Sequence, residues 1–480
     1  MKRKFVTNLA LLLFLNLLIK PIYAFGIDVG VQNAVGASSY GNYFILLNFS
    51  LIFQILLDLG IENFSRREIA RHGHLLNRYF SNILPLKLIL GVLYFIICSI
   101  VGYFMGWPAH EFKLLFVLLF NQFLASFILY FRANLGGMHM FRADSLLSVI
   151  DRFVVIVICG LLLLDPVTHA AFRIEWLIYA QTAGYLISAA LAFSMVFVKT
   201  EPLKFKIDLK YYGSFLRKSL PYALLILLMA TYLRIDTVLL GKLLVNGKEQ
   251  AGIYAQSFRI IEILSNYGYL FTIILLPVFS KMIKQKESVV HLIRLSFMLL
   301  MIPAIIITFG CLMYRNEIMD ILYHEHVENS ARVFGILIFS FLGMCITYIF
   351  GTLLTANGSL MQLNTMAAIA VSINLILNVL LIRRFGVIGA AIANMTTQLF
   401  TAAYQIILAK TTFHFQTDFN LLLRLVVFLV LVAAGSMLFS RIPVFWVYSL
   451  GIYLSFAVLL SVVLGLLKVR SVWEIVLHDK

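Results

Sequence analysis

The sequence predicts an all-α polytopic membrane protein with about 14 transmembrane helices, arranged as two pseudo-symmetric six-helix bundles plus two C-terminal helices. Of its 480 residues, 62% are hydrophobic and only 12% are charged, and the mean hydropathy is +0.96. A soluble globular protein carries about twice as many charged residues. The cysteines all lie in apolar runs, so we expect packing residues and neither disulfides nor a metal site. They are Cys98, Cys159, Cys311 and Cys345.

A helix that crosses a bilayer needs roughly 20 mostly apolar residues, because lipid offers its backbone no hydrogen-bond partner. Runs of this kind cover residues 5–27, 38–60, 83–106, 112–131, 145–165, 174–198, 219–241, 252–277, 290–314, 331–354, 364–382, 386–410, 421–440 and 444–467. The first run has the basic start of a signal peptide, but Lys20 interrupts its apolar part. We therefore expect segment 5–27 to be retained as the first span.

The distribution of Lys and Arg predicts that both termini lie in the cytoplasm. Lys2, Arg3 and Lys4 precede the first span, and an even number of spans returns the chain to the same side. In this orientation the cytoplasmic loops and tails carry roughly three times as many Lys and Arg as the external loops. The net charge of +16 therefore reflects membrane topology, and we expect no binding of nucleic acid.

A polar, lysine-rich segment between the sixth and seventh spans predicts the domain organisation. The expected parts are an N-terminal six-helix half (1–198), a cytoplasmic linker (199–218), a C-terminal six-helix half (219–410) and two additional helices with a short cytoplasmic tail (411–480). A short echo favours related halves, because Gly41-Asn42-Tyr43 opens the second span and Gly252-Ile253-Tyr254 opens the eighth. Repeats of this kind are typical of transporters built from two similar bundles.

Charged residues inside the predicted spans are the main candidates for function, because each costs at least ~2.5 kcal/mol at the membrane centre and normally faces a partner or a wet cavity. Lys20 precedes Pro21 in the first span, where the missing amide donor can bend the helix and let the ammonium point inward; the alternative is that Lys20 snorkels to the interface. Arg259 and Glu262 stand three apart in the eighth span and share a helix face. They form either a purely structural ion pair or a functional one, in which Glu262 neutralises Arg259 in the empty cavity or binds a coupling cation. A guanidinium holds phosphate bidentately, which makes Arg259 the foremost candidate for binding an anion.

Two further charged pairs lie in the fifth and seventh spans. Arg234 and Asp236 are two residues apart and therefore point to different faces of their helix. Asp236 either contacts another helix or binds a coupling cation. Asp151 and Arg152 stand early in the fifth span, where they either mark the interface or reach a cavity.

Two polar segments lie outside the spans. Arg66, Arg67 and Arg71 follow the second span, where they either meet anionic headgroups or make the first contact with an anionic substrate. His324-Glu325-His326 stands in the longest external loop, near 315–330. It offers ligand types without a convergent set, so we expect a solvated loop and no metal site.

Three stretches carry a family likeness. The end of the second span reads Leu57-Asp58-Leu59-Gly60-Ile61-Glu62, followed by Arg66-Arg67-Glu68-Ile69-Ala70-Arg71. The seventh and eighth spans read Leu233-Arg234-Ile235-Asp236-Thr237-Val238-Leu239-Leu240-Gly241, then Ala251-Gly252-Ile253-Tyr254 and Arg259-Ile260-Ile261-Glu262. The third stretch is Arg384-Phe385-Gly386-Val387-Ile388-Gly389-Ala390-Ala391. With twelve core helices and two trailing ones, essentially the whole chain resembles the lipid-linked oligosaccharide flippases, the polysaccharide branch of the multidrug, oligosaccharidyl-lipid and polysaccharide exporter superfamily.

The resemblance implies a flippase that moves undecaprenyl-pyrophosphate-linked oligosaccharide repeat units to the outer leaflet of a bacterial inner membrane, for O-antigen, capsule or exopolysaccharide. It also implies two halves with alternating access and a cationic cavity for the pyrophosphate. Basic residues of the first and eighth spans in similar cavities match Lys20 and Arg259, with Lys20 departing from the Arg of the pattern, and Glu262 follows as in related lipid flippases. Expected partners are the lipid-linked substrate, the bilayer, a polysaccharide polymerase and other assembly proteins.

Two other functions stay open at this stage. The same fold could export cationic drugs or small molecules, although the basic set Lys20, Arg152, Arg234 and Arg259 favours an anionic cargo. A polysaccharide polymerase or ligase would be expected to present a sizeable external loop with acid or base groups, and the longest external loop here is short. We therefore expect a non-enzymatic transporter with no cofactor. The sequence has no P-loop, so ion gradients or the membrane potential would drive transport instead of ATP.

Overall fold

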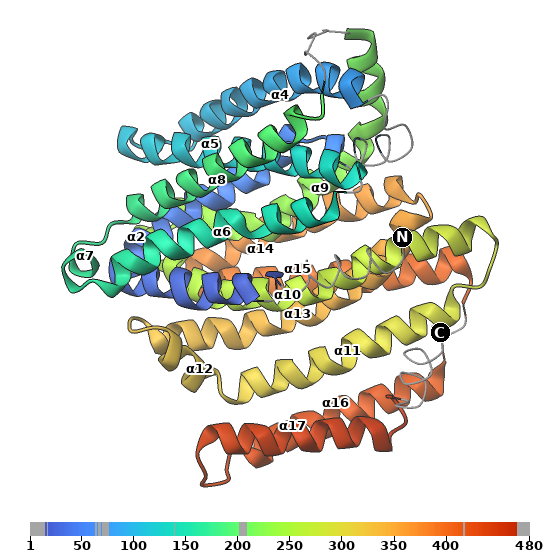
Figure 1. Cartoon of the computed structure of the whole chain (residues 1–480). Helices are drawn as coiled ribbons and strands as arrows, with labels where there is room; N and C mark the ends of the chain where they lie inside the picture. The colour runs from blue at the N-terminus through green and yellow to red at the C-terminus, as the bar shows by residue number, and fades with distance from the viewer. Residues whose placement is uncertain are drawn as a thin grey trace. The chain divides into compact units, whose positions relative to one another are not determined.

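The computed structural model describes residues 15, 16, 18–62, 65, 69, 76–138, 140–200, 209–415 and 418–467. Every regular element in these residues is a helix, which confirms the predicted all-α class. The chain forms two compact units, Met1–Ala255 and Gln256–Lys480. Within each unit, long helices run alongside one another (Figure 1).

The first unit joins the helices of the predicted N-terminal half to the first helices after the linker. Its elements are η1 (Ile22–Asp28), α2 (Val29–Ile52), η2 (Gln54–Leu57), α4 (Leu76–Phe104), α5 (Ala109–Gly137), α6 (Phe141–Leu164), α7 (Pro166–Ala170), α8 (Ile174–Phe197), α9 (Leu209–Leu243) and the start of α10 (Gly247–Lys284). Helix α8 packs against α5 and α6, and α2 packs against α5 and α9. Because α9 packs on α2, the compact units divide at Ala255 within α10, whereas the repeat in the sequence divides at the linker.

The second unit contains the rest of α10 and all later helices. These are α11 (Val290–Met313), α12 (Arg315–Leu322), α13 (Val327–Ala356), α14 (Leu360–Phe385), α15 (Val387–Phe413), α16 (Phe419–Phe439) and α17 (Trp446–Val463). Helix α15 packs against α13 and α14, and α11 packs against α13. The trailing pair α16 and α17 packs together and against α11, where the Tyr453 hydroxyl donates to the carbonyl of Ile306.

Most of the predicted spans coincide with long helices; residues 5–14 of the first, 5–27, lie outside the described residues, and helix α2 begins and ends earlier than the second, 38–60. In the described part of the chain, eleven helices are long and apolar enough to cross a membrane. Helices α2 and α15 cover two further predicted spans and are more polar because they bury amides and hydroxyls between helices, for example Gln32, Asn48, Asn394 and Gln398. Three of the cysteines are buried and one is partly buried, and all four are unbridged, as expected of packing residues.

The first helices are bent where the sequence contains proline and glycine. Directly after Pro21 the backbone widens into the π-helix η1, as expected where proline removes a hydrogen-bond donor. Gly36 interrupts α2 with a φ of 78°, a conformation that residues with a Cβ rarely adopt.

Two predicted loops are wrong in part. The segment near 315–330 was expected to be an external loop, but its first part forms the amphipathic helix α12, Arg315–Leu322. The break between the fourth and fifth spans, predicted at residues 132–144, is also shorter. Helix α5 continues to Gly137 and α6 begins at Phe141, so Arg132 and Asp144 both lie within helices.

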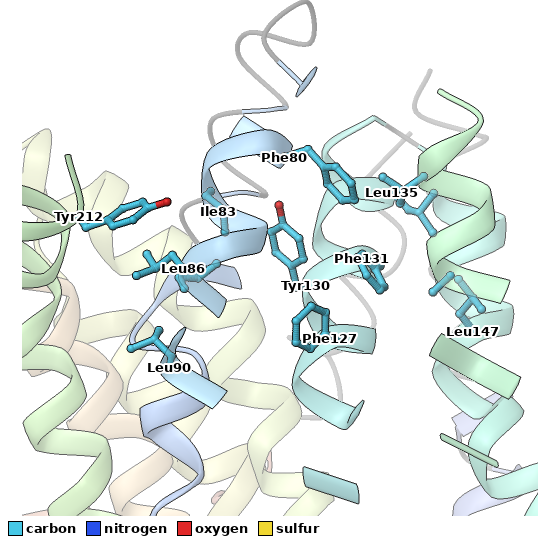
Figure 2. Close-up of a cluster of buried hydrophobic side chains, with 13 residues drawn as sticks. Phe80, Ile83, Leu86, Leu90, Phe127, Tyr130, Phe131, Leu135, Leu147 and Tyr212 are labelled. Atoms are coloured by element: carbon cyan, nitrogen blue, oxygen red, sulfur yellow. The ribbon is translucent and has the colours of Figure 1, made fainter. Parts of the chain in front are cut away.

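A cluster of buried side chains closes one end of the first unit (Figure 2). Phe80, Ile83, Leu86 and Leu90 of α4 meet Phe127, Tyr130 and Phe131 of α5, with Leu147 of α6 and Tyr212 of α9 beside them. The Tyr212 hydroxyl donates to the carbonyl of Asn82 at 2.7 Å.

Candidate functional site

A stripe of polar residues follows one face of α6. Asp144, Ser148, Asp151 and Arg152 recur at the three- and four-residue intervals that place side chains on one side of a helix. The Asn16 amide of the first span donates to Ser148 Oγ at 3.1 Å, and Arg152 Nη1 donates to the Ser148 carbonyl oxygen at 3.4 Å. The polar stripe of α6 therefore faces the first span in an otherwise apolar bundle.

Lys20 lies one helical turn after Asn16 and faces the same stripe. Asn16 and Arg152 both hydrogen-bond to Ser148, which places this part of the first span beside Arg152, and the charges of Arg152, Arg132 and Asp151 act on the Lys20 ammonium. Lys20 and Arg152 were proposed from the sequence as separate candidates, and the structure brings them together. We call the whole set the polar seam: Asn16, Lys20, Arg132, Asp144, Ser148, Asp151 and Arg152.

A second polar cluster forms where η1 meets α2 and α8. The hydroxyl of Tyr40 donates to Asp28 Oδ1 at 2.8 Å, and both residues are buried. Gln181 of α8 donates to the Tyr43 hydroxyl at 2.9 Å and to the Tyr23 hydroxyl at 3.1 Å. Sequence reasoning missed Asp28 because it falls in the gap between two predicted spans.

Arg234 and Asp236 point to different partners, as their spacing predicts. Arg234 Nη1 donates to Asn48 Oδ1 of α2 at 2.8 Å. The buried carboxylate of Asp236 accepts a hydrogen bond from the Tyr254 hydroxyl of α10 at 3.0 Å. Helix α9 is therefore tied to α2 and to the start of α10 through these two charged residues, and neither lies in the polar seam.

Arg259 and Glu262 form an ion pair in the second unit. Arg259 Nη1 donates to Glu262 Oε2 at 2.9 Å, and both side chains stay about one-fifth exposed. The same unit buries a cluster of neutral amides between α14 and α15, where Asn374 donates to Thr397 Oγ1 at 3.3 Å and Asn378 donates to Asn374 Oδ1 at 3.0 Å. Arg66, which the sequence suggests as a first contact for an anionic substrate, lies outside the described residues.

Lys87 is a buried cation that sequence reasoning overlooked because it stands inside a long apolar run. Its side chain is 1% exposed, and Nζ donates to the Leu57 carbonyl oxygen at 3.0 Å and to Ser126 Oγ at 2.7 Å. Asp58 Oδ1 lies 3.9 Å away, and the rings of Phe127 and Tyr130 flank the ammonium at 5.6 Å. Lys87 thus fixes the end of η2 against α4 and α5.

An acidic side chain ties the other end of the first unit together. Glu111 of α5 is buried and lies 2.6 Å from Lys248 Nζ at the start of α10. Nearby, Lys242 of α9 donates to the Met105 carbonyl oxygen at 2.6 Å. These contacts hold the α9–α10 connection against the α4–α5 connection.

The fold and the charges paired inside it define a multi-pass membrane protein of the transporter type. The family model described as polysaccharide biosynthesis protein matches residues 5–283, more than half of the chain. The chain therefore belongs to this family of polysaccharide biosynthesis proteins, which confirms the resemblance found in its sequence.

Individual relatives agree with this assignment. A Haloferax volcanii protein named as a probable low-salt glycan biosynthesis flippase, Agl15, is 27% identical over 375 residues, or 75% of this chain and 74% of the relative. The lipid II flippase MurJ in an inward closed conformation has a TM-score of 0.70 at 13% identity, covering 96% of this chain and 99% of that one. An inward-facing multidrug resistance MATE family transporter of the MOP superfamily has a TM-score of 0.61 at 15% identity, covering 82% and 94%. The predicted superfamily fold is confirmed.

Proposed function

We propose that this chain is a flippase that carries undecaprenyl-pyrophosphate-linked oligosaccharide units across the inner membrane of a bacterium, for the assembly of a surface polysaccharide. The observation that carries the proposal is the polar seam, which gathers three basic side chains inside an apolar bundle. Family membership links the chain to polysaccharides, and the Haloferax relative is named as a glycan biosynthesis flippase. The chain would act as a transporter and not as an enzyme.

The charges explain why such a substrate needs a protein. A pyrophosphate headgroup carries about two negative charges, and hydrocarbon offers it neither counter-ions nor hydrogen bonds. Lys20 and Arg152 would receive the headgroup in the first unit, and Arg259 would receive it in the second. Glu262 would hold Arg259 while no substrate is bound, since the two already pair at 2.9 Å. The fork of Arg259 would then bind phosphate oxygens bidentately.

The remaining candidates would support the transport cycle. Arg66 would make the first contact at the cytoplasmic surface, and Arg234 would contribute a further positive charge. Asp236 and Asp151 would pair with neighbours or take part in ion coupling. In this proposal the halves 1–198 and 219–410 alternate access around the linker 199–218, with both termini in the cytoplasm and an ion gradient or the membrane potential as the driving force.

The decisive experiment locates the lipid-linked oligosaccharide in cells that lack this chain. A membrane-impermeant probe applied to intact cells reports the outer leaflet, and total lipid extract reports the sum. We expect accumulation that faces the cytoplasm and is relieved by the wild-type chain. Unpolymerised units on the outer face would indicate a polymerase or ligase instead, and an unchanged location and amount would favour a drug exporter.

Arg259→Ala tests the site within this function. We expect the variant to abolish surface polysaccharide while its level in the membrane stays normal, because the pyrophosphate loses its bidentate partner. Arg332→Ala is the matched control, since Arg332 also pairs with an acid on its own helix, Glu328, but both side chains are more than half exposed. Normal export by Arg259→Ala would refute the assignment.

A further inference from the structure

Arg132 and Asp144 form an ion pair within the polar seam that neither the predicted site nor the family assignment includes. Arg132 Nε donates to Asp144 Oδ1 at 2.7 Å, joining the end of α5 to the start of α6. The Arg132 side chain is 18% exposed and that of Asp144 is 9% exposed. Arginine has five N–H donors, and this bond uses only the Nε–H. The Arg132 guanidinium is therefore partly exposed and still has hydrogen-bonding capacity, whereas Asp144 is buried.

The pair lies in line with Lys20 and Arg152. Asp144 and Arg152 are eight residues apart on one face of α6, with Ser148 between them, which corresponds to about 12 Å along the helix. The charge of Arg132 also acts on Lys20. In the predicted topology, Arg132 and Asp144 lie nearer the cytoplasmic end. The polar seam therefore carries positive charge at two depths in the bundle, with Arg132 at one depth and Lys20 and Arg152 at the other.

We infer that Arg132 and Asp144 form an anion site at the cytoplasmic end of the polar seam, which we call the outer anion site. It binds the diphosphate of the lipid-linked substrate before the diphosphate reaches an inner anion site, formed by Lys20 and Arg152 deeper in the bundle. This inference rests on the proposed function. In the empty protein the Asp144 carboxylate occupies the guanidinium edge that phosphate oxygens would take. An arriving diphosphate displaces the carboxylate, and two phosphate oxygens replace one carboxylate oxygen on the Arg132 fork.

A purely structural ion pair makes a different prediction from a displaceable one. If the pair only staples α5 to α6, removing either charge weakens the bundle, and both changes impair binding in the same direction. If Asp144 competes with the substrate for Arg132, removing the carboxylate charge frees the guanidinium for phosphate. Arg132→Ala and Asp144→Asn then change the affinity for the diphosphate in opposite directions. A purely structural ion pair would not produce this result.

The test measures binding of undecaprenyl diphosphate to the purified full-length protein in detergent, with undecaprenol as the phosphate-free comparison. We expect Arg132→Ala to bind the diphosphate about tenfold more weakly and Arg132→Lys to lose less, because lysine keeps the charge without the fork. Asp144→Asn should bind the diphosphate about threefold more tightly, because the substitution removes a negative charge that repels the phosphates. Affinity for undecaprenol should not change.

The control variant is Arg142→Ala, which removes the same charge at an exposed position near the start of α6, the helix that carries Asp144. It should bind like the wild type, and thermal stability of each variant reports whether it is folded. Inorganic pyrophosphate should rank the variants in the same order with lower affinity. If only pyrophosphate ranks them so, the site binds free phosphate and the lipid assignment is wrong.

Two results would overturn the inference while leaving the proposed function intact. One is equal affinity of Arg132→Ala and Arg142→Ala for undecaprenyl diphosphate. The other is weaker binding by Asp144→Asn together with Arg132→Ala, which would identify a structural staple. A wild-type protein that binds undecaprenyl diphosphate no better than undecaprenol would refute the proposed function itself, and the outer anion site with it.

Discussion

Replacing Gly252 by alanine tests how closely α2 and α10 must approach. A Cβ at Gly252 would lie 2.0 Å from the carbonyl oxygen of Ala37, and one at Gly41 would lie 1.8 Å from the carbonyl oxygen of Lys248. Cβ atoms do not approach other heavy atoms within 3.0 Å, so the two backbones must separate by about 1 Å. The separation also stretches the 2.9 Å hydrogen bond from the Gln32 amide to the Gly252 carbonyl oxygen.

The expected cost follows from two opposing terms. Alanine in place of glycine stabilises a helix by about 1 kcal/mol. Overpacking costs about 1 to 3 kcal/mol when side chains can rearrange. Here the Cβ of Gly252→Ala meets backbone atoms of α2, which cannot rotate away, so we expect the upper end of that range and a net destabilisation of about 2 kcal/mol.

The assay is the thermal denaturation temperature, Tm, of the purified protein in detergent, together with surface polysaccharide in cells. Gly252→Ala should lower both. Gly451→Ala is the matched control, because Gly451 lies inside α17 with no atom within 4 Å of its Cβ position. The control should keep or raise the Tm. Equal Tm values for the two variants would refute the argument that α2 and α10 need a residue without a Cβ where they cross.

Three further substitutions test the charged contacts. Lys87→Met should lower the stability by about 2 kcal/mol, seen as a lower Tm, because the Leu57 carbonyl oxygen and the Ser126 hydroxyl lose their buried donor; an unchanged Tm would contradict this role. Glu111→Gln should lower the Tm less than Lys87→Met, because the Lys248 side chain is 45% exposed and water can replace its partner. Lys20→Arg should retain more polysaccharide export than Lys20→Ala if positive charge is what matters, and equal export would make Lys20 a bystander.

The short sequence repeat at the starts of the second and eighth spans corresponds to a reciprocal pair of contacts in the structure. Gly41 approaches Lys248, and Gly252 approaches Ala37. Ala37 and Lys248 are separated by the same number of residues as Gly41 and Gly252, so the two contacts exchange under the sequence repeat, as a two-fold relation between similar helices requires. The sequence could identify these glycines as equivalent. The sequence could not show that the two glycines lie where α2 and α10 contact each other, because a repeat identifies equivalent positions and gives no information about which positions are in contact.

The membrane spans were predictable because their signal is local. About 20 apolar residues in a row identify a helix whatever surrounds it. The charged site is different, because the partners of each charge lie far away in the chain. Lys87 looks like an isolated defect in an apolar run until Leu57 and Ser126 are seen beside it. Arg132 looked like part of a loop because the apolar run before it ends at residue 131.

Exposure separates the structural cations from those that a substrate can reach. Lys87 is enclosed, and protein oxygens and aromatic rings surround its ammonium, so an anion could contact it only after the end of η2 had unfolded. Arg132 and Arg259 are 18% and 21% exposed, and each is paired with a carboxylate. A paired acid lowers the cost of keeping a guanidinium inside an empty bundle, and an incoming phosphate can take its place. In the proposed function, the same arrangement in both compact units would serve a carrier of an anionic headgroup.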